Sequence, residues 1–135
     1  MSLNKTITIP GLSNGVTYDV QLKAVYSDGS VHISNPISAM PYTTPGAPTL
    51  VRVDELSPTS LAIHFIAPNN NGGATITNYK YSLDNGVTWV VVYPTTTASP
   101  ITVADLTTGT SYYIRLLAVN AAGDGTPTDE TVAAT

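Results

Sequence analysis

Residues 101–119 read Ile-Thr-Val-Ala-Asp-Leu-Thr-Thr-Gly-Thr-Ser-Tyr-Tyr-Ile-Arg-Leu-Leu-Ala-Val, and residues 7–25 read Ile-Thr-Ile-Pro-Gly-Leu-Ser-Asn-Gly-Val-Thr-Tyr-Asp-Val-Gln-Leu-Lys-Ala-Val. Matching positions, such as Leu12 and Leu106 or Tyr18 and Tyr112, are 94 residues apart throughout. A constant spacing of this size indicates a repeated domain, because solenoid units are only about 20–50 residues long. Each copy predicts a strand, a turn at Leu-x-x-Gly-x-x-Tyr, and a second strand whose apolar residues alternate.

The two Leu-x-x-Gly-x-x-Tyr turns and the run Ala-Val-Asn-Ala-Ala-Gly at 118–123 resemble the fibronectin type III domain. In that family the tyrosine lies at a strand corner and bonds back to the preceding backbone. The resemblance implies an all-β fold, an immunoglobulin-like antiparallel sandwich of two sheets and seven strands. It also implies a binding or spacing module, of the kind found in extracellular, cell-surface or virion proteins and sometimes beside carbohydrate-acting enzymes.

Composition narrows the function classes. The 135 residues allow one core of ordinary size and a remainder. Only 10% of the residues are charged, the net charge is −4, and the five Lys and Arg residues form no basic stripe, which argues against nucleic-acid binding. The absence of cysteine excludes disulfides and thiol chemistry.

Targeting signals are not expected in this sequence. Met1-Ser2-Leu3 is too short and too polar for a secretory signal and fits a cloning leader. The longest apolar run, Trp89 to Tyr93, is far too short to insert in a membrane. An extracellular, cell-surface or virion protein is still the expectation, with its targeting signal outside this sequence.

The repeat predicts two parts of unequal size. Residues 1–42 correspond to the C-terminal half of a fibronectin type III-like repeat, with three strands around Ile7 and Ile9, from Tyr18 to Ala24, and at Ile37 to Ala39. Residues 43–48 form a Pro/Thr-rich linker, because closely spaced prolines cannot occupy a central strand. Residues 45–135 form a complete domain.

The complete domain should contain all seven strands of a sandwich. Asp84-Asn85-Gly86 predicts a hairpin, because Asn and Gly accept the positive φ of such turns. Phe65 takes a position where the family usually carries tryptophan. The predicted core comprises Leu61, Ile63, Phe65, Tyr79, Tyr81, Leu106, Tyr112, Ile114, Leu116 and Ala118.

Candidate catalytic groups favour structural or surface roles. His64 lies on the strand face opposite Phe65, which predicts a solvated histidine. His32 lies in a turn with no second histidine or cysteine nearby, although a metal site needs several converging ligands. The sequence predicts no enzyme, no cofactor and no metal.

Two acidic pairs, at 54–55 and 129–130, are also poor candidates for catalysis. Neighbours on a strand point to opposite faces, whereas paired catalytic carboxylates must flank one bond. The Gly123-Asp124-Gly125 loop corresponds to the loop that carries Arg-Gly-Asp in integrin-binding members of the family. Ala122 stands in place of the arginine, so that function is not implied.

The strand from Trp89 to Tyr93 is apolar on both faces, which is unusual at a sheet edge and predicts a contact site. Packing of Trp89 in the fold is the favoured interpretation of this residue. An exposed aromatic platform for sugar is the alternative. The function predicted is therefore a non-catalytic protein-binding or spacer module, and the alternative is an accessory polysaccharide-binding module of a carbohydrate-active enzyme.

The half-repeat lacks the strands that should cover its apolar residues. Exposure of so many apolar side chains is unfavourable by about 1.5–3 kcal/mol each, so another chain is expected to cover them. We predict a homodimer, formed either by packing of two half-repeats face to face or by exchange of a half-repeat for residues 100–135 of the partner. The candidate interface residues are Ile7, Ile9, Tyr18, Val20, Leu22, Ala24, Ile37, Trp89, Val91 and Tyr93.

Overall fold

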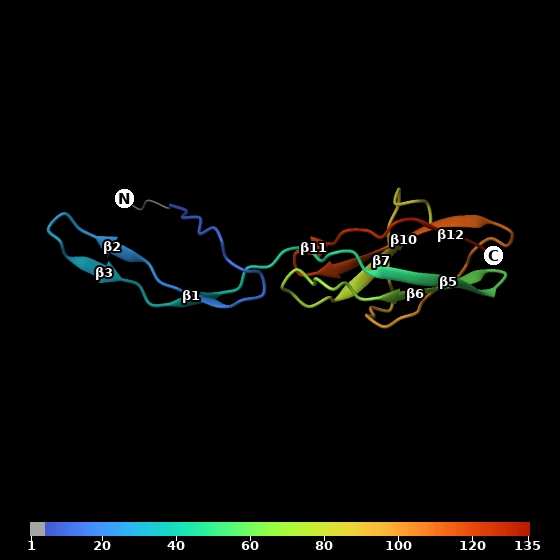
Figure 1. Ribbon diagram of the computed structural model, residues 1–135, viewed down its shortest axis with the longest axis horizontal. Coiled ribbons are helices and arrows are strands. Elements are labelled where there is room, and N and C mark those ends of the chain that lie inside the picture. Colours follow the sequence, from blue (N-terminus) through green and yellow to red (C-terminus); the bar gives the residue numbers. More distant parts are fainter. Residues whose placement is uncertain (1–4) are drawn as a thin grey trace. The chain divides into compact units, whose positions relative to one another are not determined.

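The computed structural model describes residues 5–135 and divides the chain into two compact units, Met1–Tyr42 and Thr43–Thr135 (Figure 1). All regular elements of the described residues are β-strands. No helix in residues 5–135 is long and apolar enough to cross a membrane. The leader predicted at residues 1–3 lies outside the described part of the chain.

The second unit is a sandwich of two antiparallel sheets, which confirms the predicted fold class (Figure 1). The first sheet has the order β5-β6-β9, from β5 (Thr49–Ser57), β6 (Ser60–Ile66) and β9 (Ile101–Val103). The second has the order β11-β10-β7-β8, from β7 (Asn78–Ser82), β8 (Val90–Val91), β10 (Ser111–Asn120) and β11 (Gly123–Asp124). The last strand, β12 (Thr131–Ala134), also pairs with β10.

The core between these sheets agrees with the predicted one. Eight predicted residues are buried, and Tyr81 and Tyr112 pack partly buried against them. The rings of Phe65 and Tyr79 lie 4.5 Å apart, so the phenylalanine fills the centre together with a tyrosine from the opposite sheet. Val92, Ile101 and Val103 also belong to this core.

The first unit contains a broken hairpin. Strands β1 (Tyr18–Val20) and β4 (Ile37–Ala39) pair with each other, and so do β2 (Lys23–Val25) and β3 (Val31–Ile33). The strand predicted around Ile7 and Ile9 does not form. In the second unit the equivalent strand, β9, is held by β6, and residues 5–42 contain no counterpart of β6.

From the tyrosine to the leucine, the hairpin repeats the pairing of the second unit at the spacing of 94. The tips differ, because Val25 pairs with Val31 whereas Val119 pairs with Asp124. Tyr18 pairs with Ala39 as Tyr112 pairs with Ala133. Leu22 bonds to Ser34 through both backbone and hydroxyl, as do the corresponding leucine and threonine at 116 and 128. This part of the half-repeat therefore has the strand pairing of the complete domain without its covering sheet.

Both predicted tyrosine corners are present. The Tyr112 hydroxyl accepts a hydrogen bond from the Thr107 N–H at 2.8 Å. The Tyr18 hydroxyl accepts one from the Ser13 N–H at 3.0 Å. The preceding turns also match, since Gly15 and Gly109 both have positive φ.

The Pro-rich segment at 43–48 carries no strand and packs on the second unit. The Thr43 N–H donates to the Gly72 carbonyl at 2.8 Å, and the Asn120 amide donates to the Thr43 carbonyl at 2.7 Å. Pro45 and Pro48 are buried. A Cβ at Gly72 would overlap the Thr43 carbonyl oxygen, which explains the glycine there.

Candidate binding surfaces

The apolar face of the first unit is open in this chain. Leu22 is 59% exposed, whereas its counterpart Leu116 is fully buried. Ile7 is 68% exposed, and its counterpart Ile101 is 3% exposed. Six members of the candidate interface fall in this unit and are exposed or half-buried along with Leu22: Ile7, Ile9, Tyr18, Val20, Ala24 and Ile37.

The second predicted contact region, Trp89 to Tyr93, is shorter as a strand than expected. Only Val90–Val91 forms β8, which pairs with Lys80 and Tyr81 of β7 at the edge of the sheet. Val91 is exposed and Tyr93 is 92% exposed. This end of the sheet therefore presents apolar side chains on a very short edge strand, and short edges limit pairing with other chains.

Trp89 is half-buried, in line with the favoured interpretation of structural packing. A Cβ placed on Gly86 would lie 3.6 Å from the Trp89 ring and 3.5 Å from Cδ of Arg115. Both side chains therefore pack over this glycine. The Arg115 Nε donates to the Asn85 side chain at 2.7 Å, which fixes the guanidinium beside the hairpin.

The hairpin itself is organised by Asp84. Its carboxylate accepts bonds from the Thr88 hydroxyl at 2.6 Å, the Thr88 N–H at 2.8 Å and the Ser82 hydroxyl at 2.7 Å. These bonds, those from Thr88 foremost, lower the Asp84 pKa to about 2. The ionised carboxylate thus serves as the acceptor at the centre of a tight turn.

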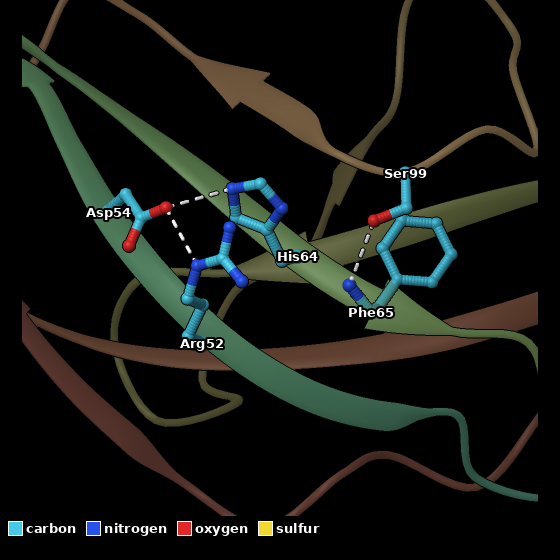
Figure 2. Close-up of polar contacts among 5 residues, drawn as sticks. All are labelled: Arg52, Asp54, His64, Phe65 and Ser99. Carbon is cyan, nitrogen blue, oxygen red and sulfur yellow. Dashed lines mark hydrogen bonds and ion pairs between the residues drawn. The ribbon is translucent and has the colours of Figure 1, made fainter.

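A charged cluster lies on the outer face of the β5-β6-β9 sheet (Figure 2). The Asp54 carboxylate lies 2.9 Å from Nε of Arg52 and 3.0 Å from Nε2 of His64. The hydrogen bond from Arg52, followed by the charges of Arg52 and His64, lowers the Asp54 pKa. The first sheet also bonds to a loop here, because the Phe65 N–H donates to the Ser99 hydroxyl at 2.9 Å.

The prediction of a solvated His64 needs correction. The residue faces outward as expected, but only 24% of its side chain is accessible, because it packs beside Asp54. Arg52 was not predicted as part of this cluster. The signal for it was the spacing of two between Arg52 and Asp54, which places both on one face of a strand.

The remaining polar candidates do not converge on a site. Asp124 is bound to Lys80 at 2.9 Å, an ion pair that crosses β10. His32 lies in β3 and not in the predicted turn, and it packs edge-on against Tyr26, with ring centroids 5.5 Å apart. Residues 5–135 contain no group of three His, Cys, Asp or Glu placed to hold a metal ion.

A hollow of about 340 Å³ lies where β5 approaches the segment before β12. It is lined by residues 47–50, 127–129 and 131, among which Asp129 alone is titratable. Acid-base chemistry requires a positioned partner for such a carboxyl. The hollow is therefore a surface groove in which Asp129 has no second acidic or basic side chain beside it.

A family model described as "Fibronectin type III domain" matches residues 46–134. The chain belongs to the fibronectin type III family. The match covers the second unit, in which the two sheets and the tyrosine corner are complete.

Curated relatives extend the similarity into the first unit. Human myomesin-2 is 33% identical over 133 residues, covering 91% of this chain and 9% of that protein. Chicken cardiac-type myosin-binding protein C is 32% identical over 117 residues, covering 82% of this chain and 9% of that protein. The chain therefore spans about a tenth of these relatives, and the alignments support a tandem repeat.

Solved structures support the same fold. A structure of titin kinase and its flanking domains has a TM-score of 0.56 and 28% identity, and it covers 69% of this chain and 17% of that one. Domains d3–d4 of the rat CD45 extracellular region have a TM-score of 0.63 and 16% identity, and they cover 97% of this chain and 70% of that one. The second likeness concerns the fold alone.

Proposed function

We propose that this chain is a non-catalytic protein-binding and spacer module of a larger multidomain extracellular, cell-surface or virion protein, and that it self-associates through its half-repeat. The observation that carries the proposal is the open apolar face around Leu22. Its counterpart around Leu116 is buried in the second unit, so the same side chains are suited to burial here.

The spacer role is supported by where the chain enters and leaves the second unit. Thr43 is bonded beside Asn120, at the end of β10. Thr135 is bonded to Gly109 and Thr110, just before β10 begins. Ten strand residues separate these positions, a span of about 30 Å at roughly 3.3 Å per residue. A module of this kind extends a chain by its own length.

The binding role is supported by three acidic side chains, because they already have partners within the fold and the apolar surfaces are open. Asp54, Asp84 and Asp124 are each engaged with neighbouring side chains in surface or turn structure. The apolar face of the first unit and the edge at β8 are the surfaces suited to contact. A relative whose name states that it binds myosin supports a protein ligand.

Sedimentation velocity between about 1 and 50 µM tests self-association, a range chosen to bracket micromolar affinity. Leu22→Asp should dissociate the oligomer, because a carboxylate in the contact would be buried without a partner. Leu56→Asp is the matched control, since Leu56 in β5 is 56% exposed, close to the 59% of Leu22. A strictly monomeric wild-type chain at the highest concentration would refute this part of the proposal.

The β8 edge is tested separately by Val91→Lys. If this edge also contributes to contact, the substitution should weaken association further, because lysine at an edge opposes strand pairing. Unchanged sedimentation would restrict the contact to the half-repeat. Neighbouring repeats and a secretion signal in the full reading frame would support the larger protein and its location.

An accessory polysaccharide-binding module remains a second candidate because Tyr93 is 92% exposed beside Val91 and Trp89. Aromatic rings at a surface stack on sugars through their apolar faces. A glycan array separates the two functions. Strong binding that is lost in Trp89→Ala and Tyr93→Ala would favour the second candidate, and an array without signal would count against it.

A further inference from the structure

One backbone edge of the half-repeat is open. Leu22 and Tyr26 bond to the returning strand through their backbone groups. Backbone groups alternate between the two edges of a strand, so those of Asp19, Gln21 and Lys23 point to the other edge. No strand of residues 5–135 pairs with this edge.

The second unit shows what such an edge binds. The equivalent positions of β10 are Tyr113, Arg115 and Leu117. Tyr113 bonds to Leu83 and Asn85, and the other two positions pair with β7 in antiparallel register. The open edge of the first unit is thus in the conformation that accepts an antiparallel strand.

We propose that a second copy of this chain supplies that strand, by antiparallel pairing of residues 18–24 with themselves about a two-fold axis at Gln21. This inference rests on the self-association in the proposed function and specifies which residues of the two copies pair. Pairing of two copies converts a two-stranded hairpin into a four-stranded sheet, in which β1 of each copy lies beside β2 of the other and the order is β4-β1 followed by β2-β3 of the partner. An isolated hairpin is marginal in water, whereas three or more strands with an apolar face support a stable sheet.

Charge selects the register. Asp19 and Lys23 lie on the polar face of the hairpin. With the axis at Gln21, Asp19 lies directly opposite Lys23 of the partner subunit, and this ion pair occurs twice. An axis at Asp19 or at Lys23 would instead oppose like charges, and an axis at Val20 or Leu22 would leave both charges without an opposite partner.

The same register also groups the apolar side chains. Val20 then faces Leu22 of the partner subunit, and Tyr18 faces Ala24 of the partner subunit. The counterparts of these four residues, Tyr112, Ile114, Leu116 and Ala118, lie in or against the core of the complete domain. Cross-strand apolar pairs of this kind stabilise antiparallel sheets.

Strand exchange is a weaker alternative on physical grounds. A half-repeat that replaced residues 100–135 of its partner would bury its own Leu22. The displaced residues 100–135 of the partner would then expose Leu116, a side chain of the same size. Equal numbers of equivalent side chains would enter and leave water, so exchange offers no net burial. Face-to-face packing buries the apolar face but leaves the backbone edge unpaired.

A single cysteine tests the register directly, because the native chain has none. At a hydrogen-bonded antiparallel pair the Cα atoms are about 5.5 Å apart, which suits a disulfide. Gln21→Cys should therefore form a disulfide-linked dimer under mild oxidation. Ser38→Cys is the matched control on the same polar face, since Ser38 lies opposite Asp19 on the outer strand. Equal cross-linking by both variants would overturn the register.

A charge swap tests the ion pairs in the whole chain. Asp19→Lys and Lys23→Asp should each raise the dimer dissociation constant about 10-fold, and the double variant should recover to within about 3-fold of wild type. Ser38→Ala removes the 2.6 Å bond from Ser38 to Asp19 without changing charge and should leave association unchanged.

The outcomes separate the inference from the proposed function. If Leu22→Asp dissociates the oligomer while both single charge variants have no effect, the copies pack face to face, and the register is wrong although self-association stands. A wild-type chain that stays monomeric overturns both. Unchanged Trp89 fluorescence in every variant confirms that the second unit remains folded.

Discussion

Leu116→Ala and Leu22→Ala truncate the same type of side chain at equivalent positions, the first in the complete domain and the second in the half-repeat that lacks its covering sheet. The two residues occupy equivalent positions, 94 apart, with the same backbone bonds. Leu116 has no exposed surface, so Leu116→Ala should leave a cavity and cost about 2–5 kcal/mol. Leu22 is 59% exposed, so in the monomer Leu22→Ala should cost below about 0.5 kcal/mol.

Urea unfolding followed by fluorescence measures the first value, because Trp89 is the chain's single tryptophan and lies in the second unit. A loss of about 2–5 kcal/mol lowers the midpoint by about 1–2.5 M, given a slope of about 2 kcal/mol/M. For Leu22→Ala the midpoint should stay at the wild-type value at about 1 µM, and the dissociation constant of the oligomer should rise instead. A similar loss of second-unit stability in both variants would refute the reasoning.

Three further perturbations address single features of the second unit. Tyr112→Phe should cost about 0.5–1.5 kcal/mol in urea unfolding, because the Thr107 N–H loses its acceptor but remains near solvent. Thr88→Ala should raise the Asp84 pKa from about 2 toward its ordinary 3.8 in an NMR titration. In the wild type, the stabilisation from ionised Asp84 is complete above about pH 4 and is lost as the pH falls through about 2, so acid unfolding of Thr88→Ala should begin at higher pH. Gly72→Ala should lower stability by at least about 1–2 kcal/mol in thermal unfolding, because φ is 75° and the added Cβ meets a backbone oxygen.

Alternation and repetition were sufficient to predict most of the fold. Leu61, Ile63 and Phe65 share a face because strand side chains alternate, and the structure buries all three. The strand at Ile7 and Ile9 failed because a strand also needs a neighbour. The sequence has the strand pattern, but the described residues of the first unit supply no strand to bond it.

The surfaces were less accessible to prediction, because they depend on pairing between distant residues. His64 was placed on the correct face, but its contact with Asp54 depends on the register between β5 and β6. Alternation along residues 18–24 places Asp19 and Lys23 on the polar face of a strand, but it does not show which backbone edge of that strand is open. The backbone bonds from Leu22 to Ser34 show that Asp19 and Lys23 border the open edge, and the sequence pattern does not specify these bonds.

The docked segment at 43–48 has a consequence for how this domain can be moved between proteins. Composition predicts a linker at residues 43–48, yet Thr43, Pro45 and Pro48 are already part of the folded second unit. A domain boundary placed at Thr49 would remove the Pro45 carbonyl, which accepts a hydrogen bond from the Thr126 N–H. It would also expose the surface against which the buried prolines pack. A junction between residues 42 and 43 would transfer the whole second unit. The prolines therefore belong to the folded domain and not to the linker between domains.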